Sequence, residues 1–242
     1  IVKTPIEPYF SEQPGWAEQH PDYYWKTLCA TCRKLLASTK IPKGFIRGVT
    51  MTTQRDTMVN VDRNGKPLRP AIVWLDQRRA GKGSWPNPVL KAALRAMKLL
   101  EAVEYTITES ESNWIRENQP EIWEKTHKFL FLSGFLTHRL VGEYVDSTGC
   151  TVGFVPFDYK TQAWAKPSDM KWKMFPMNPS LLPALVRPSE MLGYITKQAS
   201  TETGIPAGLP LIAAAADKAC EVLGSGCMSP EIACLSYGTT AT

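Results

Sequence analysis

The sequence lacks any run of about 18 consecutive apolar residues, so we expect no transmembrane helix. It also lacks the features of a signal peptide, because residues 1–10 are polar and rich in proline. Its Lys and Arg side chains are scattered and form no basic run, which indicates solvated helix surfaces rather than a nucleic-acid site. We therefore expect a protein that binds neither membranes nor nucleic acids.

Cysteine is scarce, with six residues in a chain of 242, and most of the six have apolar or small neighbours. We interpret them as reduced, buried thiols of a cytoplasmic protein. Cys29 and Cys32 form a Cys-x-x-Cys pair inside a predicted helix. A redox or metal site would need a strand–turn–helix context or a second ligand pair, and the sequence has neither. We expect no protein-bound metal site.

The composition is that of an ordinary globular protein, with 43% hydrophobic and 21% charged residues, and the length suits one large domain or two small ones. Predicted helices and strands alternate, which favours an α/β architecture. Helices are predicted over residues 22–37, 89–103, 114–118, 121–141, 200–203 and 218–223. Strands are predicted over residues 45–51, 59–61, 71–74, 153–157, 192–195, 210–216 and 232–237, with a hairpin turn at residues 62–65.

A carboxylate follows the predicted strand 210–216. This strand narrows to four consecutive alanines, and Asp217 comes directly after them. Ligands bind at the carboxyl ends of strands in open α/β sheets, and alanines let a substrate or a backbone segment come close. A carboxylate there can accept the proton of a hydroxyl group that attacks phosphorus. Asp217 can equally cap the following helix, and the two roles are compatible.

A second motif, Gly238-Thr239-Thr240, follows the last predicted strand. Backbone N–H groups and hydroxyls in such a turn can bind phosphate oxygens, because glycine permits close approach. Turns of this composition are also common without any ligand.

Two polar clusters follow strands in the first third of the chain. Gln54, Arg55 and Asp56 come after the strand that ends at residue 51, and their side chains suit a polyhydroxy ligand. Trp74 ends the predicted strand 71–74 and Asp76 follows it, so that an indole can pack on a sugar face while the carboxylate bonds hydroxyls. An exposed hairpin with an ion pair and an ordinary charged strand end remain the alternatives.

Taken in order, these motifs resemble the N-terminal half of the FGGY-type carbohydrate kinases, which include glycerol kinase and xylulokinase. The resemblance covers nearly the whole chain. It is carried by residues 14–19 with Pro21, Gln54-Arg55-Asp56-Thr57, residues 65–68 and 71–74, Asp76 with Arg78, residues 139–143 with Asp146, residues 203–210, Asp217, and Gly238-Thr239-Thr240.

The resemblance implies a ribonuclease-H-like (actin-like ATPase) domain, with a mixed sheet flanked by helices. It implies ATP-dependent phosphorylation of a sugar or polyol hydroxyl, with Mg²⁺ as a cofactor and Asp217 as the general base. Carried over position by position, the sugar site would contain Gln54, Arg55, Asp56, Trp74, Asp76 and Lys218, and the phosphates would face Gly238, Thr239 and Thr240. The resemblance does not decide whether the protein forms a homodimer.

The sequence also departs from the family pattern. Lys218 follows the aspartate where glycerol kinase has Gln, and Arg55-Asp56 replaces the Met-His of xylulokinases. These differences favour a small polyol or a ketose other than xylulose. The alternatives are a non-catalytic sugar-binding or regulatory protein on the same scaffold and another actin-like ATPase, such as a chaperone or an acetate-type kinase. The hydroxyl-binding cluster at residues 54–56 argues against the second.

The family's opening phosphate-loop hairpin and its C-terminal nucleotide domain have no counterpart in residues 1–242. We therefore expect an incomplete N-terminal domain, and we predict that this 242-residue chain alone has little or no kinase activity. A phosphorylation assay of the chain with ATP and a panel of polyols and ketoses tests this prediction. Full turnover by the chain would contradict it.

Overall fold

The computed structural model describes residues 1–83 and 85–235. The predicted phosphate-contacting residues Gly238, Thr239 and Thr240 lie outside the described residues.

The helices are α1 (Pro21–Ser38), α2 (Pro88–Ala96), α3 (Leu100–Glu109), α4 (Glu111–Asn118), α5 (Pro120–Lys125), α6 (Leu132–Val141), α7 (Lys171–Met174), α8 (Lys197–Thr203) and α9 (Asp217–Gly224). The strands are β1 (Glu18–Gln19), β2 (Val49–Met51), β3 (Met58–Val61), β4 (Ala71–Ile72), β5 (Lys128–Phe131), β6 (Val145–Ser147), β7 (Phe157–Asp158), β8 (Ala163–Trp164), β9 (Ala184–Val186), β10 (Met191–Tyr194) and β11 (Pro210–Ala213).

The strands form several small sheets, and the α/β class predicted above is confirmed. One sheet is antiparallel throughout, in the order β1-β4-β3-β5. A second sheet, β10-β11-β2, is mixed, because β11 runs antiparallel to β10 and parallel to β2. Two-stranded pairs, β6-β9 and β7-β8, complete the set among the described residues. The parallel β2–β11 pair matters most for the site, since both strands end at the same edge.

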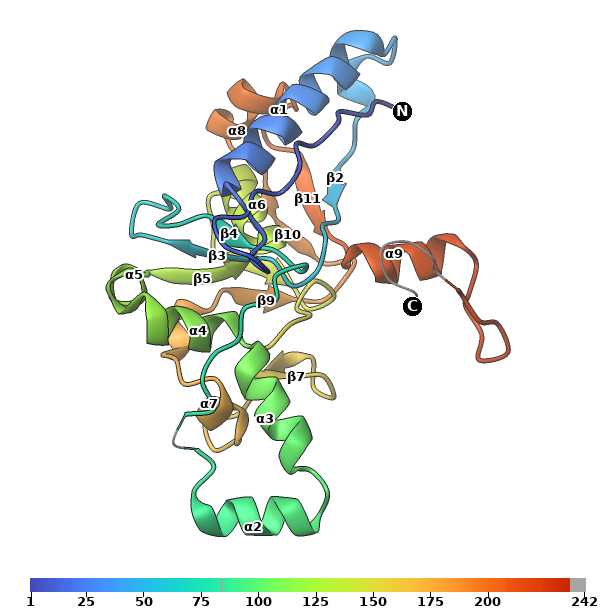
Figure 1. Ribbon diagram of the computed structural model, residues 1–242. Coiled ribbons are helices and arrows are strands. Elements are labelled where there is room, and N and C mark those ends of the chain that lie inside the picture. Colours follow the sequence, from blue (N-terminus) through green and yellow to red (C-terminus); the bar gives the residue numbers. More distant parts are fainter. Residues whose placement is uncertain (84, 236–242) are drawn as a thin grey trace.

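Two clusters of buried apolar side chains form the interior. The larger combines side chains of α1, α6 and α8 with those of β3, β5 and β11, and includes the fully buried Phe135 and Leu211. The smaller joins β3, β4 and β5 to α4 and includes Ile115 and Phe129. Full burial of a Leu or Phe side chain contributes about 1.5–3 kcal/mol. Figure 1 shows α1 beside α8 at one end of the molecule, α2 at the opposite end, and α9 projecting from the end of β11.

Several predicted elements agree with the structure. The turn after β3 forms as expected, because Asp62 Oδ1 accepts hydrogen bonds from the backbone N–H groups of Asn64 and Lys66, and Gly65 takes the left-handed conformation. The helix ending at residue 141 stops at Gly142, whose φ is 84°.

The predicted helix over residues 121–141 is wrong. The segment divides into α5, β5 and α6, and β5 pairs along its whole length with β3. Phe129, Leu130 and Phe131 are consecutive and all buried, which is the pattern of a strand covered on both faces. A short apolar run of this kind does not distinguish a strand from a buried helix by spacing alone.

Other predicted elements are shorter than expected. The helix over residues 89–103 is interrupted at Lys98, whose φ of 58° ends the helical path between α2 and α3. Residues 43–45 form a 3₁₀ turn, so the strand predicted from residue 45 begins only at Val49. Of the strand predicted at 153–157 only Phe157 belongs to one, the strand predicted at 210–216 ends at Ala213, and residues 232–235 form no strand.

All six cysteines are free thiols, but only Cys29 and Cys150 are buried, so the expectation of six buried thiols is wrong for the other four. None of the described helices combines the length and the apolar character that crossing a membrane requires.

Candidate active site

The parallel pairing of β2 with β11 brings together two predicted motifs that lie about 160 residues apart. Leu211 and Ala213 pair with Val49 and Met51. Two further hydrogen bonds extend the contact beyond the strands: Thr52 Oγ1 donates to the carbonyl of Ala215 at 2.7 Å, and the backbone N–H of Asp217 donates to the carbonyl of Thr53 at 3.0 Å. The carboxylate of Asp217 is therefore held next to the segment 54–56.

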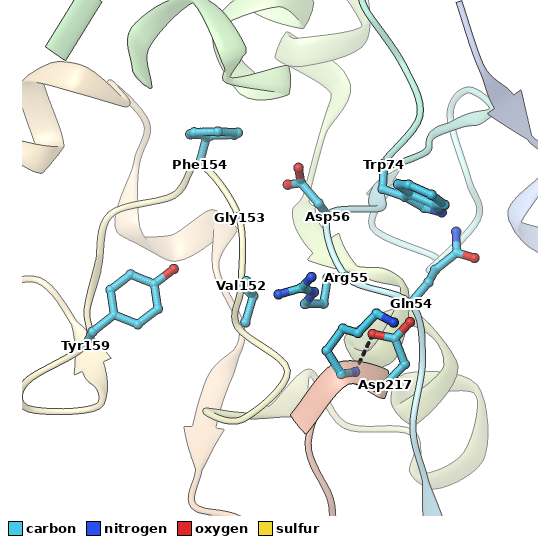
Figure 2. A pocket seen from close by; sticks show the side chains of 10 residues that line it. Gln54, Arg55, Asp56, Trp74, Val152, Gly153, Phe154, Tyr159 and Asp217 are labelled. Atoms are coloured by element: carbon cyan, nitrogen blue, oxygen red, sulfur yellow. Dashed lines mark hydrogen bonds between the residues drawn. The ribbon is translucent and has the colours of Figure 1, made fainter. Parts of the chain in front are cut away.

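A cavity of about 610 Å³ opens at this edge of the sheet. Its lining comes from separate parts of the chain, namely the loop after β2, the end of β4, the segment before β7, the β7–β8 turn and the start of α9 (Figure 2). The lining residues are Gln54, Arg55, Asp56, Trp74, Val152, Gly153, Phe154, Tyr159, Asp217 and Lys218. Six of the residues predicted from the sequence thus line one cavity.

Asp217 is exposed and is the first residue of α9. Its Oδ1 accepts a hydrogen bond from the backbone N–H of Lys218 at 2.7 Å. The N-cap position is Ala216, which makes no side-chain bond, so Asp217 lies in the first turn instead of capping the helix. A carboxylate in the first turn is stabilised by the helix dipole. The Lys218 ammonium forms an ion pair with Glu221 at 2.8 Å.

The small side chains of the alanines before Asp217 leave room for a neighbouring backbone segment, residues 147–149. The N–H of Ala216 donates to the carbonyl of Gly149 at 3.0 Å, and a Cβ at Gly149 would lie 2.9 Å from the Cβ of Ala215. Small residues on both sides therefore let the segment 147–149 pass directly against the end of β11.

The polar side chains of the loop after β2 have different roles: Gln54 is held by hydrogen bonds within the protein, whereas Arg55 faces the cavity. The Gln54 amide is held by three hydrogen bonds, since it accepts from the Tyr9 hydroxyl at 2.9 Å and donates to Thr57 at 2.8 Å and to Tyr24 at 3.3 Å. Arg55 has no comparable anchor: its guanidinium makes no hydrogen bond or ion pair within the described part of the chain. In Figure 2 it lies between Val152 and Gln54, where a ligand in the cavity would meet it.

Asp56 is the most constrained residue of the site. Its φ of 51° is in the left-handed region, which Asp adopts more readily than most residues. Its Oδ1 is buried, and a Cβ at Gly153 would lie only 2.6 Å from that oxygen. Burial raises the pKa of the Asp56 carboxyl to about 6, and the nearby Glu109 carboxylate adds to the rise. Asp56 therefore changes its charge close to neutral pH.

Trp74 follows β4, is 38% exposed and lines the cavity, but Asp76 does not. The Asp76 carboxylate is instead buried and fully engaged: it accepts a hydrogen bond from the backbone N–H of Ala17 at 2.6 Å and forms an ion pair with Arg78 at 2.7 Å. The Arg78 guanidinium lies over the ring of Trp16, 3.9 Å from its centroid. Asp76 thus holds the turn that presents Trp74.

The sequence interpretation missed one wall of the cavity. Val152, Gly153, Phe154 and Tyr159 come from residues 143–175, which spacing alone could not position. The only signal was the number of aromatic residues in a segment with little regular structure. Burial raises the pKa of the Tyr159 hydroxyl, so this hydroxyl stays protonated at neutral pH and can donate a hydrogen bond.

Within the described residues, no three His, Cys, Asp or Glu side chains converge in a way that could hold a metal ion. Mg²⁺ in nucleotide sites is commonly held by one or two carboxylates together with phosphates and water, so this donor set is compatible with an ion that arrives with its nucleotide.

A sequence model of the FGGY family of carbohydrate kinases, N-terminal domain, matches residues 3–224. The chain belongs to the FGGY family of carbohydrate kinases. The xylulose kinase of Staphylococcus epidermidis is 27% identical over 235 residues, which cover 96% of this chain and 45% of that protein. The glycerol kinase of Thermococcus kodakarensis is 27% identical over 236 residues, which cover 96% of this chain and 46% of that protein.

Solved structures of this family share the fold. The crystal structure of Plasmodium falciparum glycerol kinase with ADP matches with a TM-score of 0.74 and 21% identity, covering 96% of this chain and 47% of that one. The chain spans about half the length of the curated relatives that it matches. The family membership expected from the ordered motifs is therefore confirmed.

We predict that Gly153→Ala destabilises the protein by about 1–3 kcal/mol. The added Cβ would lie 2.6 Å from Asp56 Oδ1 and 2.9 Å from Phe131 Cε1, so the wall would have to move away from the loop after β2. Gly224→Ala is the matched control, because a Cβ there meets nothing within 4 Å. Urea unfolding of both variants measures the difference. Equal stability of the two would show that the walls do not touch as described.

Proposed function

We propose that the protein containing this chain is an ATP-dependent kinase that phosphorylates a hydroxyl group of a sugar or polyol. In support, the Asp217 carboxylate shares one cavity with Arg55, Asp56 and Trp74. Membership of the FGGY family of carbohydrate kinases supports the same reaction class. The proposal includes the actin-like, ribonuclease-H-like assignment of the fold and a cytoplasmic location.

The chemistry follows from the positions of these groups. A substrate hydroxyl that faces Asp217 gives its proton to the carboxylate as its oxygen attacks the γ-phosphorus of ATP. The bond from that phosphorus to the bridging oxygen breaks, and ADP leaves with the electron pair. Mg²⁺ bound to the phosphates would neutralise their charge during transfer. Asp217 is suited to the base role because it is exposed and lines the cavity at the first turn of α9.

The other side chains bind and orient the substrate. Arg55 donates hydrogen bonds to hydroxyl oxygens, Asp56 accepts them from hydroxyl groups, and Trp74 offers an apolar face to the carbon skeleton. Lys218 lies beside Asp217 in the lining, where its ammonium pairs with Glu221, and it is proposed as a further substrate-binding residue. Gly238, Thr239 and Thr240 are proposed as phosphate-contacting residues on the strength of the family resemblance alone. Positioning of this kind supplies most of the catalysis in phosphoryl transfer.

We predict that Asp217→Asn in the protein expressed from the complete gene lowers kcat by about two to four orders of magnitude while sugar or polyol affinity changes little. The reason is that Asn keeps the shape and the hydrogen-bond acceptor but cannot take the proton. A coupled ADP-release assay measures kcat, and calorimetry measures affinity.

The control for this experiment is Glu104→Gln, which removes a carboxylate of α3 that lies outside the cavity and pairs with Lys82. Its kcat should match that of the unaltered protein. Unchanged turnover of Asp217→Asn would reject the base assignment. Binding of a sugar without phosphoryl transfer by the unaltered protein would favour the non-catalytic alternative.

A further inference from the structure

A smaller cavity of about 40 Å³ adjoins the site and shares Asp56 and Trp74 with it. It is rich in acidic side chains, and Asp56 is the acidic residue that lines both cavities. The carboxyl groups around the smaller cavity belong to Asp56, Asp76, Glu109 and Glu111.

Two of these four carboxyl groups have cationic partners and two do not. Asp76 pairs with Arg78 at 2.7 Å, and Glu109 pairs with Arg79 at 2.8 Å. Asp56 and Glu111 form no ion pair with any described residue. Glu111 begins α4 and is only 9% exposed. Two buried carboxyl groups are therefore left to interact with each other.

Asp56 and Glu111 line the same cavity of about 40 Å³, so their carboxyl groups share a small, largely buried space. Two carboxyl groups in such a space avoid mutual repulsion only when one of them carries a proton. Glu111 is 9% exposed, whereas Asp56 also lines the larger, open cavity beside Arg55, so the geometry favours the proton on Glu111 and the charge on Asp56. In agreement, burial first, and then the charge of Asp56, raises the pKa of Glu111 well above its usual range.

We propose that Glu111 is a positioning residue: its protonated carboxyl donates a hydrogen bond to the Asp56 carboxylate and so holds Asp56 as the acceptor for a ligand hydroxyl. This inference rests on the proposed sugar or polyol site. Gly153 contributes to the same arrangement, because its missing side chain leaves room for Asp56 Oδ1. The left-handed backbone at Asp56 is then fixed from two sides, by the acid pair and by the opposite wall.

The pair has a defined electrostatic setting. The other titratable or charged groups that act on Asp56 or feel its charge are Arg55 in the same loop, Tyr105 and Glu109 on α3, and Tyr159 in the β7–β8 turn. Of these, Arg55 favours an ionised Asp56 and Glu109 opposes it. Neither removes the need for a proton between Asp56 and Glu111.

The sign of the pH dependence follows from the raised pKa of Glu111. The folded protein keeps this proton at pH values where the unfolded chain has lost it, so stability falls as pH rises from the usual glutamate pKa, about 4.3, towards the pKa in the folded state. Above that point two carboxylates face each other, and Asp56 is pushed from its position. Ligand affinity should fall over the same rise in pH.

The test uses the protein expressed from the complete gene, with Glu111→Gln, Glu111→Ala and the control Glu104→Gln. Glycerol, xylitol and D-xylulose are the probes, and calorimetry measures their Kd at several pH values. Glu111→Ala removes the donor and should weaken the probe that binds by about tenfold. Glu111→Gln keeps an N–H donor and should therefore retain ligand affinity. In this variant affinity should no longer fall at high pH, and the stability of the protein at neutral pH should rise. Glu104→Gln should match the unaltered protein.

Equal Kd values and equal pH profiles for all variants would overturn the proposal. Infrared spectroscopy tests the proton directly and without a ligand. Burial also raises the pKa of Asp146 to about 7, so the expected result is that the C=O absorption of protonated carboxyl groups at neutral pH loses one component in Glu111→Gln. The same absorption in both proteins would also overturn the proposal. If the component is lost but no probe binds, the proposed sugar site fails and the ligand role of Glu111 fails with it, while the proton on Glu111 stands.

Discussion

The site depends on one structural contact, the parallel pairing of β2 with β11. This pairing continues past the strands through the bonds from Thr52 to Ala215 and from Asp217 to Thr53. It fixes the Asp217 carboxylate beside Arg55 and Asp56 although the two segments are far apart in the sequence. Parallel strands need a long crossover connection, and here most of the domain, from β3 to β10, forms that connection. The core of the molecule therefore also serves to align the site.

The remaining contacts set the walls of the cavity around this edge. The buried Asp76–Arg78 pair, covered by Trp16, holds the turn that presents Trp74. On the opposite side, Gly153 brings the segment before β7 against Asp56. Asp56 lies where the two walls meet, and burial there raises its pKa to about 6. The pKa of a carboxyl group in that position is set by its burial and by its acidic neighbours, and would also respond to a bound ligand.

Sequence patterns predicted those parts of the fold and the site that depend on local order. The pattern of a strand followed by polar residues identified Asp217 and residues 54–56, and these residues line one cavity because both strands end at the same edge of the sheet. Spacing failed at Asp76, since the backbone N–H of Ala17 reaches its carboxylate, and the Trp16 indole reaches Arg78, only through tertiary packing. It failed at β5, where a fully buried strand has no periodicity, and at Glu111, whose proton depends on a neighbour 55 positions earlier in the chain.

We propose that the cavity at the end of β2 and β11 receives a polyhydroxy phosphate acceptor. The most direct measurement incubates the protein expressed from its complete gene with ATP labelled in the γ-phosphate and a panel of polyols and ketoses. We expect the label to move to at least one of them, and much faster than to water. Binding of ATP with transfer to none of the panel, or transfer to water alone, would contradict the proposal.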